Sequence, residues 1–124
     1  MTANWLFTGS LMAGLGVVAG AFGAHGLQKR VDADMIAVWK TAADYQIYHA
    51  LALLAVAWAA ERYATGMVQS AGWCFLAGIV VFSGSLYLLV LTGNKMLGAI
   101  TPIGGVLFIA GWVLLALTAL KTRN

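Results

Sequence analysis

Charged residues are scarce in this chain. They make up 9% of its 124 residues, against roughly 25% in an ordinary soluble domain. Apolar residues make up 62%, and a soluble fold of this size keeps too many residues exposed to bury so much apolar surface. The composition therefore predicts an integral membrane protein.

Cysteine and clustered basic residues are also lacking. Cys74 is the only cysteine and lies within an apolar run, so no internal disulfide forms and we interpret it as a small buried residue. Lys and Arg occur singly or in pairs between apolar runs. Because they form no stripe that could track phosphates, nucleic acid is not expected as a partner.

Four long apolar runs stand out, with charged residues collected between them: Trp5 to Leu27, Ala42 to Ala60, Gly72 to Thr92, and Leu97 to Leu120. Each is long enough, at ~1.5 Å per residue, to cross a hydrocarbon core of roughly 30 Å. The first run could instead be a cleaved signal peptide, but no Lys or Arg precedes it and it is too long. The prediction is an all-α, four-helix transmembrane bundle that forms one domain, residues 1–124.

We call side X the membrane face reached by the loops after the first and third runs, and side Y the opposite face. Aromatic residues fall at both faces, where amphipathic rings prefer the headgroup level. Trp5, Trp58 and Trp73 are expected at side Y and Trp39 at side X. Basic residues are divided almost evenly between the two sides and predict neither orientation.

Two segments near side X admit alternatives. Residues 32–43 have helical spacing, with Asp32 as a predicted N-cap, and either lie along the interface or extend the second span outward. In the fourth run, Pro102 either starts the helix or kinks a helix that begins near Leu97. The apolar residues 96–100 favour the kink.

Small residues recur on the helix faces. In lipid, helices associate through close packing and shared hydrogen bonds, so such stripes predict helix contacts rather than the alternative, a glycine-lined pore. The predicted packing positions are Gly9, Ala13, Gly16, Gly20, Gly23, Gly78, Gly104 and Gly105. The same surfaces could join two copies of the chain.

Polar residues inside spans are expensive and therefore informative. The candidates here are His25, Tyr45, Gln46, His49, Ser83, Ser85, Tyr87 and Thr101. Counted inward from the span ends, most lie within roughly 10 Å of side X, which predicts one shared hydrogen-bonded cluster. The cluster offers too few ligands for a metal, and no cofactor is expected.

Five motifs in order resemble the YgdD-like family of small bacterial inner-membrane proteins. They are residues 20–27 (GAFGAHGL), 39–42 (WKTA), 45–54 (YQIYHALALL), 82–87 (FSGSLY) and 98–105 (GAITPIGG). The resemblance implies a four-span protein of the inner membrane. It implies no particular activity.

Two functions compete. His25 and His49 favour binding or permeation of a proton, ion or small polar molecule, because imidazoles change charge near neutral pH. The glycine surfaces favour a structural or assembly factor that packs against lipids, a second copy or partner membrane proteins. No nucleophile elbow or HExxH helix is present, so an enzyme is not expected.

Overall fold

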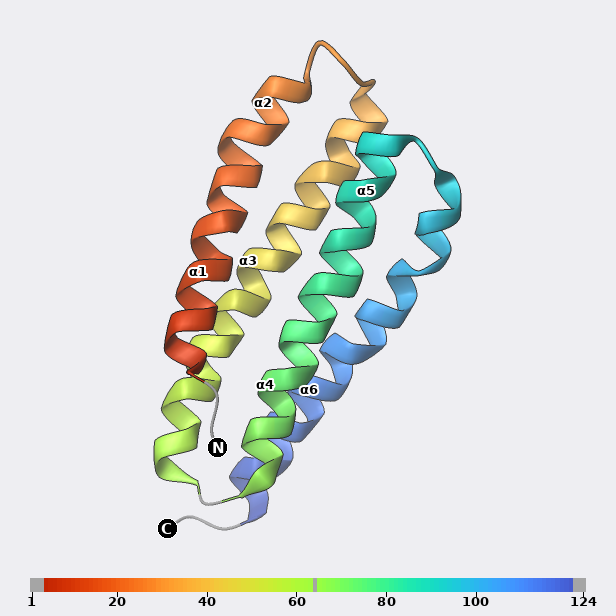
Figure 1. Ribbon diagram of the computed structural model, residues 1–124. Coiled ribbons are helices and arrows are strands. Elements are labelled where there is room, and N and C mark those ends of the chain that lie inside the picture. Colours follow the sequence, from red (N-terminus) through yellow and green to blue (C-terminus); the bar gives the residue numbers. More distant parts are fainter. Residues whose placement is uncertain (1–3, 64, 122–124) are drawn as a thin grey trace.

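The computed structural model describes residues 4–63 and 65–121, and this part of the chain is all-helical (Figure 1). The elements are α1 (Trp5–Val18), the π-helix η1 (Ala19–Gly23), α2 (Ala24–Leu27), α3 (Ala33–Arg62), α4 (Gly66–Gly78), the π-helix η2 (Ile79–Ser83), α5 (Gly84–Thr92), the 3-10 helix η3 (Lys95–Ala99) and α6 (Thr101–Lys121). The predicted all-helical class is confirmed.

Side chains next to the helix ends cap them. Asn4 accepts a hydrogen bond from the amide of Phe7 at the start of α1, and Thr65 does the same for Met67 at the start of α4. Gly93 ends α5 with φ of 72°, a left-handed conformation that glycine adopts without strain. Local sequence therefore decides where these helices begin and end.

The segment between the first two runs belongs to α3. The Asp32 side chain accepts a hydrogen bond of 2.9 Å from the amide of Met35, which confirms the predicted N-cap. From there α3 continues without interruption to Arg62. Of the two alternatives, the outward extension of the second run is the one observed.

Pro102 lies in the first turn of α6, which begins at Thr101. The expected kink is therefore wrong. Residues 95–99 form the separate 3-10 helix η3 instead, so their backbone amides are paired without a continuous α-helix. Proline suits the first turn because its missing N–H would have no partner there.

Within residues 4–63 and 65–121, three stretches are long and apolar enough to cross a membrane: Trp5–Leu27, Gly66–Thr92 and Lys95–Lys121. Helix α3 is not among them. Its first apolar stretch is interrupted by Asp44, Gln46 and His49, which lower its hydropathy.

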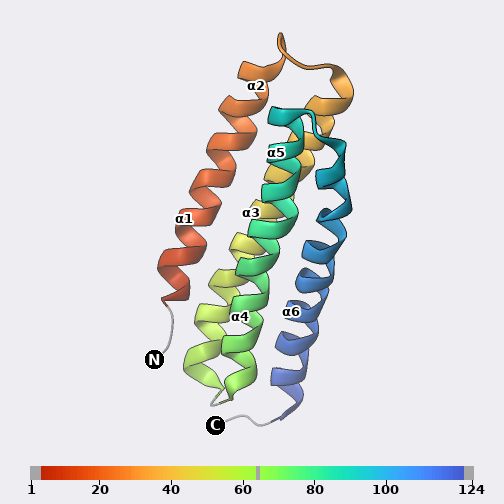
Figure 2. The ribbon, with the colours of Figure 1, turned by 45° about the vertical axis from the view of Figure 1, so that its right-hand side comes forward.

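The helices form two antiparallel pairs. Helix α1 packs along α3 and α4 along α6, while α3 also contacts α4 and α5. Figures 1 and 2 show α1 at one edge of the molecule and α6 at the other. The apolar core includes Leu53, Val56, Val68 and Phe75, all fully buried. It lies toward side Y, whereas the polar candidates lie toward side X.

Glycines permit the close approach within each pair. A Cβ added at Gly9 would lie 2.9 Å from the Ala50 carbonyl oxygen, and one at Gly16 would lie 2.6 Å from Ile47. Gly23 meets the Trp39 ring in the same way, and Gly20 is in ordinary contact with Ala43. Ala13 is half-buried. The glycines of this stripe thus face α3.

In the second pair, only one of two adjacent glycines faces a neighbour. A Cβ at Gly104 would overlap the backbone of Phe82, and one at Gly78 would lie 2.5 Å from Phe108. At Gly105 a Cβ would meet nothing within 4 Å. Gly105 therefore packs against no helix of the same chain, because successive helix residues point about 100° apart, and its predicted packing role remains a prediction for contacts outside the chain.

Trp5 also differs from its predicted place in an aromatic belt. Its side chain is only 2% exposed and covers Gly72, where a Cβ would lie 2.5 Å from the ring. Its indole N–H donates a 2.9 Å hydrogen bond to Gln69. Trp5 therefore fastens the start of α1 to α4.

Candidate functional site

Gln46 lies at the centre of the polar candidates, where α1, α3 and α5 meet. Its side-chain nitrogen donates to the Met12 carbonyl oxygen at 2.9 Å, and its side-chain oxygen accepts from the Tyr87 hydroxyl at 2.7 Å. Gln46 itself is only 6% exposed. One amide thus joins three helices, using a donor for one neighbour and an acceptor for the other.

Both ring nitrogens of His49 have partners. Nδ1 lies 2.9 Å from the Tyr45 carbonyl oxygen, and the Trp112 indole N–H donates to Nε2 at 3.1 Å. Since a carbonyl only accepts and an indole N–H only donates, the proton must lie on Nδ1 and the ring must be neutral. The Phe108 ring stacks on it, with centroids 3.6 Å apart.

The hydroxyl groups form two further contacts between helices. Ser83 donates to the Ala42 carbonyl oxygen at 2.7 Å, which links η2 to α3. The Ser85 and Thr101 hydroxyl oxygens are 2.6 Å apart, which links α5 to α6. Both serines are buried, so neither hydroxyl is free for solvent.

Two candidates lie outside these contacts. Tyr45 is 39% exposed, and its ring stacks on Phe82 with centroids 4.8 Å apart. His25 is exposed on α2, and its imidazole takes part in none of the hydrogen bonds found among the described residues. The structure therefore does not bring His25 to His49.

The polar side chains form separate pairs and triads rather than one network. Within residues 4–63 and 65–121, every buried side-chain nitrogen and oxygen has a hydrogen-bond partner. The same residues contain no group of three His, Cys, Asp or Glu side chains suited to a metal. Buried polar groups are costly unless they are satisfied, so this arrangement stabilises the bundle.

Tryptophans are the polar residues that the sequence interpretation missed. Trp39, expected in a belt, donates its indole N–H to the Ala19 carbonyl oxygen at 2.7 Å. Trp112 completes the partners of His49. Its position in the middle of the fourth run was the available signal, because an indole N–H so deep in a span needs an acceptor.

The Gln46 and Tyr87 pair reaches a groove at the surface of the bundle. About 320 Å³ in volume, it is lined by Leu15, Ala19, Trp39, Gln46 and Tyr87. Its walls come from α1, η1, α3 and α5. The groove exposes the edge of the Gln46 and Tyr87 pair.

Long apolar helices with satisfied polar groups between them define a small helical membrane protein. A family model described as "Protein of unknown function (DUF423)" matches residues 19–105. The chain belongs to this family. The predicted resemblance to a YgdD-like family was therefore wrong in the family it named.

Curated relatives agree with this assignment. A UPF0382 membrane protein of Staphylococcus aureus (strain bovine RF122 / ET3-1) is 50% identical over 117 residues, which covers 94% of this chain and 95% of the relative. The UPF0382 membrane protein YwdK of Bacillus subtilis (strain 168) is 47% identical over 118 residues, 94% of this chain and 96% of the relative. No solved structure matches the chain.

Proposed function

We propose that this protein is a structural or assembly factor of the cell inner membrane, which it crosses four times, and that it packs against partner membrane proteins or lipids. One observation carries the proposal: every buried side-chain nitrogen and oxygen of residues 4–63 and 65–121 has a hydrogen-bond partner, and many of these partners lie on another helix. A group that moves a solute must exchange partners, whereas a structural group keeps them.

The proposed fourth crossing is made by α3. Its 30 residues exceed the length that a span requires, about 20 residues. Two of its polar side chains, Gln46 and His49, are buried and hydrogen-bonded to other helices, whereas Asp44 and Tyr45, nearer its start, are exposed. Polar groups satisfied in this way are compatible with the hydrocarbon region.

The hydrogen bonds support a structural role because they join different helices. Gln46 connects α3 to α1 and α5, Ser83 connects η2 to α3, and Trp112 connects α6 to α3. Helices in lipid lack a hydrophobic drive to associate, so bonds and glycine contacts of this kind hold them together. The result is a rigid bundle with large apolar outer faces.

Photo-crosslinking from those outer faces tests the proposal. A photoreactive phenylalanine analogue replaces Phe22 on α1's edge of the bundle or Val106 on α6, which are 73% and 65% exposed. Irradiation of native membranes is expected to give a defined protein adduct, either a second copy or another membrane protein, from at least one face. The same probe at Lys29, in the loop at side X, reports background crosslinking.

Lipid adducts alone from both faces would contradict packing against a second copy or a partner membrane protein, and would leave packing against lipids. Adducts from Lys29 that match those from Phe22 and Val106 would also contradict it, because the helix faces would then confer no selectivity.

A second candidate is binding or permeation of a small polar molecule, favoured by the groove at Gln46 and Tyr87. Purified protein in liposomes separates the two functions. The structural proposal predicts proton and solute fluxes equal to those of empty vesicles. A flux above that level, lowered by Tyr87→Phe or His49→Ala, would support the second candidate instead.

A further inference from the structure

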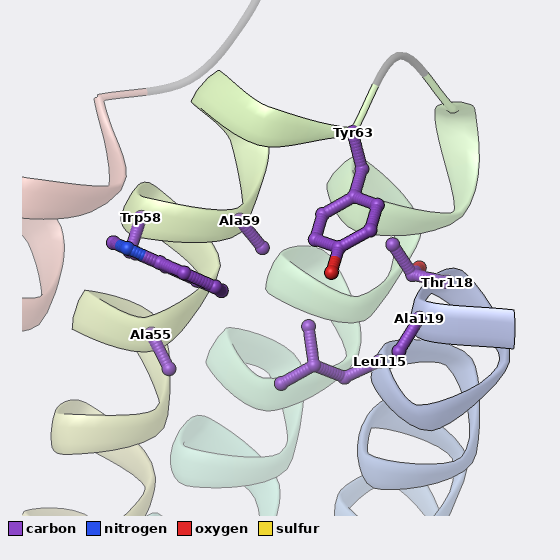
Figure 3. Close-up of a pocket in the computed structure, with 7 residues that line it drawn as sticks. All are labelled: Ala55, Trp58, Ala59, Tyr63, Leu115, Thr118 and Ala119. Atoms are coloured by element: carbon purple, nitrogen blue, oxygen red, sulfur yellow. The ribbon is translucent and has the colours of Figure 1, made fainter. Parts of the chain in front are cut away.

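A groove near side Y separates the ends of α3 and α6. Seven residues line it: Ala55, Trp58, Ala59, Tyr63, Leu115, Thr118 and Ala119. Figure 3 shows the α3 residues on one wall and the α6 residues on the other. The Thr118 hydroxyl is bonded to the Leu114 carbonyl, which leaves the lining almost entirely apolar.

The groove is too small to hold a whole helix. Its volume is about 170 Å³, and a helix with its side chains is about 10–12 Å across. Small residues, Ala55, Ala59 and Ala119, form much of its walls. Part of a hydrocarbon chain is the occupant that a small apolar groove of this kind suits.

Two basic residues stand at the end of the groove. Arg62 lies in the last turn of α3, and Lys121 lies in the last turn of α6. The guanidinium of Arg62 is 4.8 Å from the centre of the Trp58 ring, and Trp58 is itself part of the lining.

We propose that this groove binds an anionic phospholipid, with one acyl chain between α3 and α6 and the phosphate beside Arg62 and Lys121. Guanidinium and ammonium groups are the usual phosphate partners in proteins, and basic residues at span ends attract anionic headgroups. Trp58 and Tyr63 lie at the level where aromatic rings meet headgroups. The apolar slot and the two cations thus match the two parts of one lipid molecule.

The inference rests on the proposed span by α3, and the two can fail separately. If α3 does not cross, cysteines placed at its two ends are labelled from one side of the membrane. If only the lipid inference fails, they are labelled from opposite sides and lipid binding does not respond to the variants below.

The test is native mass spectrometry of the purified full-length protein with added phosphatidylglycerol or phosphatidylcholine. The double variant Arg62→Gln, Lys121→Gln is expected to lower the affinity for phosphatidylglycerol about tenfold and to leave that for phosphatidylcholine unchanged. Ala119→Phe, which fills the groove from its exposed rim, is expected to lower the affinity for both lipids.

A matched control removes two exposed positive charges near side X, Lys29→Gln with Lys40→Gln. It is expected to keep the preference for phosphatidylglycerol. Wild-type preference in the Arg62 and Lys121 variant would overturn the proposal, as would an equal loss in the control. Unchanged lipid binding by Ala119→Phe would overturn the placement of the chain.

Discussion

At the scale of single residues, His49 illustrates how a titratable side chain becomes structural. The Tyr45 carbonyl and the Trp112 indole occupy its two ring nitrogens, and the Phe108 ring covers one face. Protonation would require Nε2 to donate, and the bond from Trp112 would then be lost. The imidazole that suggested proton transfer in the sequence therefore serves to hold α6 against α3.

The bond between Gln46 and Tyr87 should be measurable as a coupling energy. In a double-mutant cycle of Gln46→Leu and Tyr87→Phe, we expect a coupling between about 0.6 kcal/mol, the average for side-chain bonds between membrane helices, and about 1.7 kcal/mol, their maximum. Unfolding in mixed detergent micelles supplies the free energies. We expect this coupling because the Tyr87 hydroxyl donates directly to the Gln46 side-chain oxygen in a partly buried bond.

Tyr48 provides the control for this cycle. It is a 54% exposed tyrosine on the same helix as Gln46. A cycle of Gln46→Leu with Tyr48→Phe should give no coupling. Equal coupling in both cycles would show that the first value reflects a general change in the bundle.

The adjacent glycines 104 and 105 allow a second prediction. Gly104→Ala should destabilise the protein by about 1–3 kcal/mol, because the new methyl group overlaps the Phe82 backbone. Gly105→Ala should be neutral or stabilise by about 0.5–1 kcal/mol, as alanine favours a helix where space is open. Thermal unfolding in detergent compares them, and equal effects would contradict this packing.

These glycines also show which properties of single residues the sequence could predict. The presence of a packing surface on the fourth run followed from its small residues. Which of Gly104 and Gly105 faces the neighbour depends on the rotation of α6, and that is decided by contacts with Phe82 and Phe108 from distant parts of the fold. Trp112 was missed for the same reason, since its acceptor lies on another helix.

At the scale of elements, the two π-helices stand out. Each interrupts the first helix of a pair, η1 between α1 and α2 and η2 between α4 and α5. The amide of Ala24 bonds to the Ala19 carbonyl, five residues back, and Trp39 donates to the same carbonyl. In η2, Ser83 bonds to the backbone of α3. Side chains thus bind across helices where the turns are widened.

A π-turn holds one residue more than an α-turn, which leads to a deletion test. Removing Val80 from η2 should restore an α-helical turn and leave both flanks in register. Removing Ile109 from α6 should rotate every later residue by about 100°. Val80 and Ile109 are matched in exposure, at 63% and 65%.

We therefore expect the Val80 deletion to reach the membrane folded and the Ile109 deletion to fail, as judged by expression and by detergent-resistant thermal unfolding. The reverse order, or equal loss in both, would show that η2 is not a single-residue insertion.

Sequence patterns predicted elements unevenly. The N-cap at Asp32 and the helical spacing that follows are local, and the start of α3 was predicted from them. The π-helices were not predicted, because the bond from Trp39 that accompanies η1 comes from a different helix. The kink at Pro102 was wrong because the apolar residues before it could also form a 3-10 turn.

At the scale of the whole molecule, composition alone indicated the class. Low charge and long apolar runs predicted a helical membrane protein, and the family membership agrees. The positions of the apolar runs relative to one another were harder to predict from the sequence, because they depend on the glycine contacts and on Gln46, His49 and their partners. The polar side chains that make those contacts also make α3 less apolar than the neighbouring helices.

The crossing by α3 is the claim on which the bundle in the membrane depends. The direct measurement is labelling of single cysteines in intact cells by a membrane-impermeant maleimide, in a Cys74→Ser background. Gln28→Cys lies before α3 and Glu61→Cys lies near its end, and both positions are exposed. The account predicts that they are labelled from opposite sides of the membrane, with Asn94→Cys on the side of Gln28→Cys. Labelling of Gln28→Cys and Glu61→Cys from the same side would contradict it.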